Sequence, residues 1–257
     1  MNNSAKIGEQ PAFDGQTPAQ SDEKRKLIFA AIMAGFLLVL IWTIWFFEKA
    51  FHLDLSSLAL RPRTWSGLAG IFMEPLLHGN LAHIASNSIP LFLLLGGALY
   101  FYRIAGLKAF GWIWILTGAL VWCFGRPNLH IGASGIVYGL ASFHAFSGFI
   151  RNDTRLMSVS LLTVFLYGSM IWGIFPIVPG ISWETHLMGG LSGLFTAIYY
   201  RKDGPQPKQY FDDESDDDSG SLSEPNSDGN QDNTGGFQVR YTYLPQVPDT
   251  DGQQNPG

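Results

Sequence analysis

The chain has 257 residues, of which 47% are hydrophobic, with a single cysteine and a formal net charge of −5 at pH 7. Because Cys123 stands alone, an intramolecular disulfide framework and a cysteine metal cluster are excluded. Long apolar runs recur from residue 27 to residue 200, with the charge gathered at their ends, which argues against a soluble protein. Cys123 lies inside one of these runs and is expected to be a small buried apolar residue.

The charge is divided unevenly along the chain. Residues 203–257 contain twelve Asp or Glu residues against Lys208 and Arg240, a net charge of −10, so the remainder carries +5. This segment has few aliphatic side chains, which predicts that it stays disordered, and the first 23 residues are similarly polar. We therefore expect a disordered N-terminal tail at 1–23, a membrane domain at 24–202 and a disordered acidic tail at 203–257.

The first apolar run, residues 27–47, has 21 residues without a charge and is long enough to span a bilayer as a helix. It follows Glu23-Lys24-Arg25-Lys26, but it exceeds the ~7–15 residues of a signal-peptide core, so we interpret it as a permanent anchor. After a long loop at 48–80, the pattern predicts five further helices, at 81–101, 104–122, 133–150, 156–178 and 183–200. The predicted fold class is an all-α bundle of six transmembrane helices.

Basic residues predict the orientation of this bundle, since Lys and Arg concentrate on the cytoplasmic side. With the N-terminus inside, the inner segments carry twelve Lys or Arg residues and the outer segments four. Both ends of the chain are therefore expected in the cytoplasm. The compact layout favours a bacterial inner membrane, and an organellar membrane stays an alternative.

The depth of polar residues then follows from a helical rise of ~1.5 Å per residue. Ser134 lies about 25 Å above the inner end of its helix, and His186 about 22 Å above the same face. Asn87 lies about 24 Å up, with His83 one turn higher. Polar groups at membrane depth are costly and usually face an interior cavity, so their common level predicts one site a little below the outer surface.

The residue types at this level are those of nucleophilic catalysis. A serine hydroxyl needs a base to take its proton, and His186 can serve Ser134. Ser134 also opens a helix, where free backbone N–H groups can stabilise an oxyanion, with His83 and Asn87 as further donors. No carboxylate sits at this depth except Glu184, on another face of its helix from His186, so a Ser–His dyad is predicted. Other residues are expected to support the dyad through packing: Tyr138, against the His186 ring, and Gly189 and Gly193, which with Gly190 let two helices approach closely.

Three stretches together resemble the rhomboid family of intramembrane serine proteases: "HGNLAHIASN" (78–87), "GASGIVYG" (132–139) and "HLMGGLSG" (186–193). The resemblance covers about residues 27–200. It implies Ser134 as nucleophile, His186 as base, and His83 and Asn87 at the oxyanion site. The remaining motif residues are implied to be supporting ones: His78, Gly132, Gly135, Tyr138, Gly189 and Gly193. The Trp-Arg pair that many members carry in the first outer loop is absent, and Arg63-Thr64-Trp65 stands there instead.

The resemblance implies cleavage of single-span membrane proteins near the outer face, with the lipid bilayer as surroundings and without cofactor, metal or nucleic acid. Two alternatives stay open: a catalytically inactive relative that binds membrane clients, and a channel or transporter. A metal site is disfavoured because no H-E-x-x-H or cysteine cluster is present. His144 and His52 fit structural roles, and His130 is open between a structural role and the rim of the site.

Overall fold

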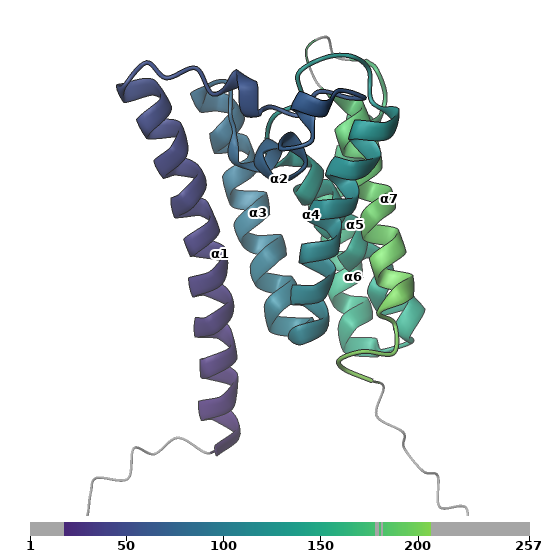
Figure 1. Ribbon diagram of the computed structural model, residues 1–257. Helices are drawn as coiled ribbons and strands as arrows, with labels where there is room; N and C mark the ends of the chain where they lie inside the picture. Colours follow the sequence, from purple (N-terminus) through teal and green to yellow (C-terminus); the bar gives the residue numbers. More distant parts are fainter. Residues whose placement is uncertain (1–17, 178–179, 181, 207–257) are drawn as a thin grey trace, which may run out of the picture. The chain divides into compact units, whose positions relative to one another are not determined.

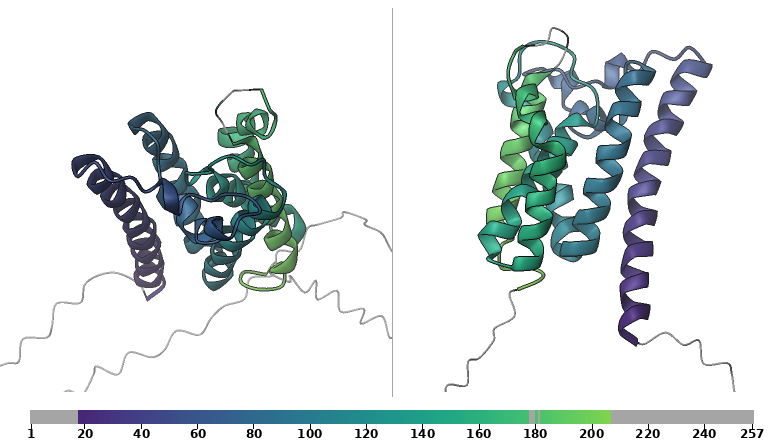
Figure 2. Two further views of the ribbon diagram at one scale, coloured as in Figure 1. Left: turned by 45° about the horizontal axis from the view of Figure 1, so that its top comes forward. Right: turned by 180° about the vertical axis from the view of Figure 1, so that it is seen from behind.

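The computed structural model describes residues 18–177, 180 and 182–206. Within them the chain is helical, and the two tails, except for residues 18–23 and 203–206, lie outside the described residues. The long helices are α1 (Pro18–Ala50), α3 (Leu81–Tyr102), α4 (Ile104–Phe124), α5 (Ser134–Arg151), α6 (Thr154–Tyr167) and α7 (Trp183–Tyr199) (Figure 1). Helix α5 contacts α3, α4, α6 and α7. Helix α1 packs on α3, and the two helices are neighbours in both views of Figure 2.

The ends of these helices differ from the prediction in two places. Helix α1 begins at Pro18, nine residues before the predicted start, so residues 18–23 are helical and not part of a disordered tail. The predicted helix 156–178 is α-helical only to Tyr167 and continues as the 3-10 helix η4 (Gly168–Ile174). Cys123, expected in the interior, is a free and exposed cysteine near the end of α4.

Local side-chain bonds explain where two helices begin. Asn80 precedes α3, and its side-chain oxygen accepts the His83 N–H at 2.9 Å. Asp153 accepts the Leu156 N–H at 2.9 Å in the same way before α6. Such caps satisfy backbone donors that a helix cannot pair internally. The α3 cap bears on the site, because it fixes the turn that carries His83.

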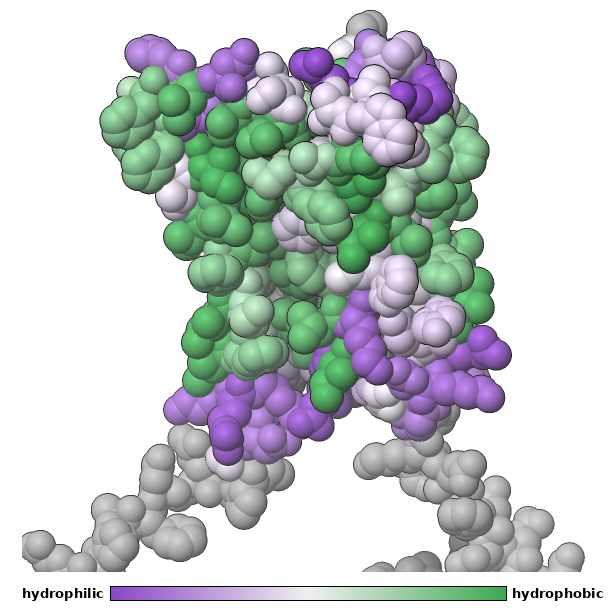
Figure 3. All heavy atoms as spheres, in the orientation of Figure 1, coloured by the Kyte–Doolittle hydropathy of each residue, from purple (hydrophilic) through white to green (hydrophobic). Residues whose placement is uncertain are grey.

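Four described helices are long and apolar enough to cross a membrane: Gln20–Ala50, Leu81–Tyr102, Ile104–Phe124 and Thr154–Ile174. Helices α5 and α7 have 18 and 17 residues and are more polar on average than α3 and α4. A hydrophobic band covers the face drawn in Figure 3, and hydrophilic residues gather above and below it. A band of this kind fits the apolar core of a bilayer.

The loop before α3 is a packed element and not an extended connection. It contains η1 (Ser56–Leu58), η2 (Trp65–Gly67), α2 (Gly70–Met73) and η3 (Glu74–Leu76). Two indole N–H groups of α4 hold its backbone: Trp114 donates to Phe72 O at 3.2 Å and Trp122 to Thr64 O at 3.0 Å. Glu74 lies in this anchored loop and is buried, with only 2% of its surface exposed.

Candidate active site

Ser134 and His186 face each other from two neighbouring helices. Ser134 is the first residue of α5, and its Oγ lies 2.9 Å from Nε2 of His186 on α7. The other ring nitrogen, Nδ1, lies 2.9 Å from the carbonyl oxygen of Gly173 in η4. Because a carbonyl only accepts, Nδ1 carries the proton and Nε2 is left to accept from the serine hydroxyl. The neutral histidine is therefore held in the tautomer that a general base needs.

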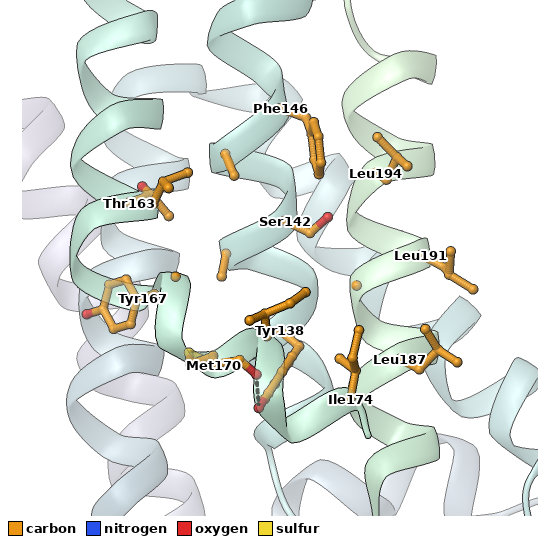
Figure 4. Close-up of a pocket in the computed structure, with 16 residues that line it drawn as sticks. Tyr138, Ser142, Phe146, Thr163, Tyr167, Met170, Ile174, Leu187, Leu191 and Leu194 are labelled. Carbon is orange, nitrogen blue, oxygen red and sulfur yellow. Dashed lines mark hydrogen bonds between the residues drawn. The ribbon is translucent and has the colours of Figure 1, made fainter. Parts of the chain in front are cut away.

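The Tyr138 side chain covers the histidine. Its ring stacks on the His186 ring with centroids 4.1 Å apart and planes 5° from parallel. Its hydroxyl donates to the carbonyl oxygen of Met170 at 2.8 Å, the bond drawn as a dashed line in Figure 4. Met170 and Gly173 both belong to η4, so this short helix orients the imidazole directly through the Gly173 carbonyl and indirectly through the bond to Tyr138.

Glycines allow the two helices to come within reach of this hydrogen bond. A Cβ atom on Gly189 would overlap the carbonyl oxygen of Gly135, and one on Gly193 would overlap that of Gly139. By contrast, a Cβ atom on Gly190 would meet nothing within 4 Å. The glycine stripe is thus a backbone-to-backbone contact between α5 and α7, and any larger residue at 189 or 193 would separate Ser134 from His186.

Backbone donors and one histidine surround the front of Ser134. The Val137 N–H donates to Ala133 O at 3.1 Å, so the amides of Ser134, Gly135 and Ile136 precede this bond at the start of α5. Gly132 has a φ of +112°, and a Cβ atom there would stand 2.5 Å from Nε2 of His83. The positive φ favours glycine at 132, and a Cβ atom there would force the His83 ring to move. The His83 ring consequently lies against the turn that leads into Ser134.

His78 and Asn87 form a second layer beside this turn. Nε2 of His78 lies 3.3 Å from Nδ2 of Asn87 and accepts the Ala133 N–H at 3.4 Å. Burial lowers the pKa of His78 to about 4, so the ring is neutral at physiological pH and can accept from both donors. Asn87 keeps a second amide hydrogen for another acceptor. The structure therefore brings His78, His83 and Asn87 together beside Ser134.

A buried polar chain behind the site was not predicted. Burial raises the pKa of Glu74 to about 8, so at neutral pH its carboxyl is mostly protonated. Its Oε1 accepts from Thr185 Oγ1 at 3.2 Å, and its carbonyl oxygen accepts the Gly132 N–H at 2.8 Å. Glu74 thus joins the turn before Ser134 to the residue before His186.

The chain continues through Ser182 to His130. Ser182 Oγ lies 2.7 Å from Thr185 Oγ1 and 2.6 Å from Nδ1 of His130. Nε2 of His130 donates to Arg126 O at 3.0 Å, and the Arg126 guanidinium pairs with Glu184. His130, which the sequence left open, is therefore a buried part of the scaffold behind the site. Glu184 is engaged by Arg126, and no carboxylate in the described part of the chain contacts His186.

The other two histidines lie away from Ser134. His144 is buried on α5 and donates from Nε2 to Leu94 O at 2.9 Å, which is a structural hydrogen bond between α5 and α3. His52 is exposed in the loop after α1. Among the described residues, no group of three or more His, Cys, Asp or Glu side chains is arranged to hold a metal ion.

The site is thus a serine and a histidine that face each other from two helices of an apolar helical bundle. Residues 64–203, more than half of the chain, match the Rhomboid domain family. The uncharacterized protein Rv1337 of Mycobacterium tuberculosis is 36% identical over 171 residues, covering 61% of this chain and 68% of the relative. The uncharacterized protein ML1171 of Mycobacterium leprae is 35% identical over 155 residues, covering 55% and 59%. The chain belongs to the rhomboid family and is a membrane protein.

Proposed function

We propose that this protein is an intramembrane serine endopeptidase that uses Ser134 as nucleophile and His186 as general base. The observation that carries the proposal is the 2.9 Å contact between Ser134 Oγ and His186 Nε2, with Nδ1 committed to Gly173 O. The close glycine contact between α5 and α7 maintains this geometry. Membership of a family whose members are typically intramembrane serine proteases supports the same conclusion.

The proposed reaction has two halves. As Oγ of Ser134 attacks the carbonyl carbon of the scissile bond, its proton passes to Nε2 of His186, and the carbonyl oxygen becomes an oxyanion. His186 then gives this proton to the leaving amine, and an acyl-enzyme ester remains. Water attacks the ester while His186 takes its proton, and the return of that proton to Oγ frees Ser134 and the acid product.

The oxyanion would be stabilised by the backbone amides at the start of α5 and by the side chains of His83 and Asn87. Removal of one such donor typically costs ten- to a thousand-fold in turnover and acts on the transition state more than on substrate binding. His83→Ala and Asn87→Ala are therefore expected to lower kcat more than they raise KM. A rise in KM alone, with kcat unchanged, would contradict this assignment.

The membrane arrangement is part of the proposal. We infer six spanning helices, α5 and α7 included, with both termini cytoplasmic and Ser134 within about two turns of the outer surface. Substrates would be single-span membrane proteins with the N-terminus outside, an orientation that rests on the family resemblance. Since a regular helix hides its carbonyls, the cut segment must unwind, which favours weak helix formers below the cut and small residues at it. The cellular location we propose is a bacterial inner membrane.

A fluorophosphonate probe, which reacts with activated serines, tests the proposal on the purified full-length protein. Wild type is expected to be labelled, whereas Ser134→Ala and His186→Ala are not. Ser142→Ala is the matched control, because Ser142 lies two turns further along the same helix, where it lines a groove (Figure 4), and forms no hydrogen bond with His186. Labelling of Ser134→Ala at the level of wild type, or an unlabelled wild type that is folded, would overturn the proposal and favour an inactive, client-binding relative.

A further inference from the structure

A basic cavity lies at the end of the bundle opposite the Ser134–His186 site. It has a volume of about 420 Å³ and is formed where α1 begins, α3 ends, α6 begins and the segment after α7 passes. Its lining residues are Glu23, Lys26, Tyr100, Phe101, Arg103, Arg155, Gly204 and Pro205. Three of these are basic and one is acidic, so the cavity attracts anions.

The single carboxylate in the lining is already engaged. Glu23 accepts from Lys26 Nζ through Oε1 at 2.9 Å and from the Tyr100 hydroxyl through Oε2 at 2.9 Å. Lys26 is also paired with Asp22 at 2.7 Å. Neither Arg103 nor Arg155 forms an ion pair with a carboxylate in the described part of the chain. Arg103 interacts with Asp22, and Arg155 with Glu23, only through longer-range attraction, so the lining keeps more positive than negative charge.

Arg103 occupies a backbone conformation that favours glycine. Its φ is +56° and its ψ −123°, at the junction between α3 and α4. A side chain there costs conformational energy, yet within the described residues the Arg103 side chain makes no hydrogen bond that would explain it. Arg155 is exposed and lies over the Phe101 ring, 5.6 Å from its centroid. Both arginines line the cavity, and the Arg155 guanidinium also packs on the Phe101 ring.

The surroundings indicate which anion fits. Leu27, next to Lys26, is 59% exposed, and Ile104, next to Arg103, is 71% exposed. The cavity therefore sits at the boundary between the apolar band and the hydrophilic end seen below it (Figure 3). A phospholipid has its phosphate at this boundary and its acyl chains beside the apolar band. Arginine binds phosphate through two parallel N–H donors, and basic pockets between helices at a membrane surface bind anionic headgroups.

We propose that this cavity binds the headgroup of an anionic phospholipid through Arg103 and Arg155, with Lys26 as a third positive charge. The segment after α7 forms one wall because Arg151 holds its backbone. The Arg151 guanidinium donates to Tyr200 O and Asp203 O, each at 2.5 Å, and to Arg201 O at 3.1 Å. A lipid bound here would contact three spanning segments and the point where the acidic segment 207–257 leaves the domain.

The test is native mass spectrometry of the full-length protein, delipidated in detergent and titrated with phosphatidylglycerol or phosphatidylcholine. Wild type is expected to retain one phosphatidylglycerol preferentially. Arg103→Gln/Arg155→Gln should retain it roughly thirtyfold more weakly, since each basic residue near an anionic surface contributes about fivefold. The matched control is Arg25→Gln/Lys202→Gln, which removes two charges at the same end outside this cavity. Unchanged melting temperatures would show that both variants are folded.

Three outcomes would overturn the proposal. The first is that the Arg103/Arg155 variant retains phosphatidylglycerol as well as wild type does. The second is that the Arg25/Lys202 control variant loses as much phosphatidylglycerol binding as the Arg103/Arg155 variant, which would mean that binding depends on the overall charge of this end and not on the cavity. The third concerns the acidic tail as competing occupant, tested by replacing residues 212, 213, 214 and 216–218 with Asn or Gln. Retention of lipid only after this neutralisation would assign the cavity to the tail instead.

Discussion

Two sides of helix α5 differ in how closely they are packed near the Ser134–His186 pair. Against α7 the contact is made by backbone, with Gly189 and Gly193 facing the carbonyl groups of Gly135 and Gly139. Between α6 and α7 a groove of about 310 Å³ opens beside α5, lined by side chains such as Ala145, Leu191 and Thr163 (Figure 4). We call the glycine contact between α5 and α7 the rigid side and the groove the loose side. The rigid side positions the serine and the histidine. The loose side includes η4, whose carbonyl groups orient the imidazole.

The largest effect is expected from breaking the rigid contact. Gly189→Ala would place a methyl group into the carbonyl oxygen of Gly135 and force α7 away from α5. Overpacking of this kind costs about 1–3 kcal/mol or more, and the added distance should abolish fluorophosphonate labelling of Ser134. Gly190→Ala is the control, since it meets nothing within 4 Å. Thermal unfolding and labelling measure both effects, and equal behaviour of the two variants would disprove the packing account.

The second effect concerns Glu74, which is buried on the rigid side and bonded to Thr185. Its pKa is raised from 4.5 to about 8, so between these values the folded protein binds more protons than the unfolded chain. The contribution to stability is complete below pH 4.5 and is lost as pH rises through about 8. Glu74→Gln stays neutral, so its melting temperature should lack the part of the pH dependence that Glu74 causes. If the melting temperatures of wild type and Glu74→Gln changed by the same amount from pH 5 to 9, the prediction would be contradicted.

A smaller effect is expected where the loose side meets the histidine. Tyr138→Phe removes the hydroxyl that donates to Met170 O at 2.8 Å and keeps the ring stacked on His186. Loss of one such bond costs about 0.5–1.5 kcal/mol, so turnover of a single-span reporter substrate should fall several-fold. Tyr138→Ala removes the stacking as well and should be more impaired. Turnover of Tyr138→Phe as low as that of Tyr138→Ala would show that the ring contributes nothing.

The smallest effect should come from filling the groove. Ala145 lines this groove, and Ala145→Leu would add three carbons to it. Because no backbone contact is displaced, the change in stability should stay below about 1 kcal/mol. Labelling of Ser134 should persist. Loss of labelling in this variant would show that the loose side is as tightly constrained as the rigid one.

Some parts of this arrangement could be predicted from sequence and others could not. Apolar runs located the long helices, and three motif stretches indicated the residues that the structure brings together around Ser134. The packed loop before α3 and the buried Glu74 were missed, because a short, mixed segment has no periodicity that reveals burial. The 3-10 extension η4 was also missed, since its residues continue the apolar pattern of α6. A carboxyl group between apolar loop residues was the one available signal for Glu74.

The bond from His186 Nδ1 to the carbonyl oxygen of Gly173 limits which mutations can disturb the orientation of the histidine. In a triad, a single codon change can remove the acidic residue that orients the histidine. Here the acceptor belongs to the main chain and is present whatever amino acid is encoded at 173. A substitution can disturb it only by moving η4, as a Cβ atom at this position would, because it overlaps the Tyr138 hydroxyl. No substitution can therefore remove the group that orients the base. A larger residue at 173 can only displace it.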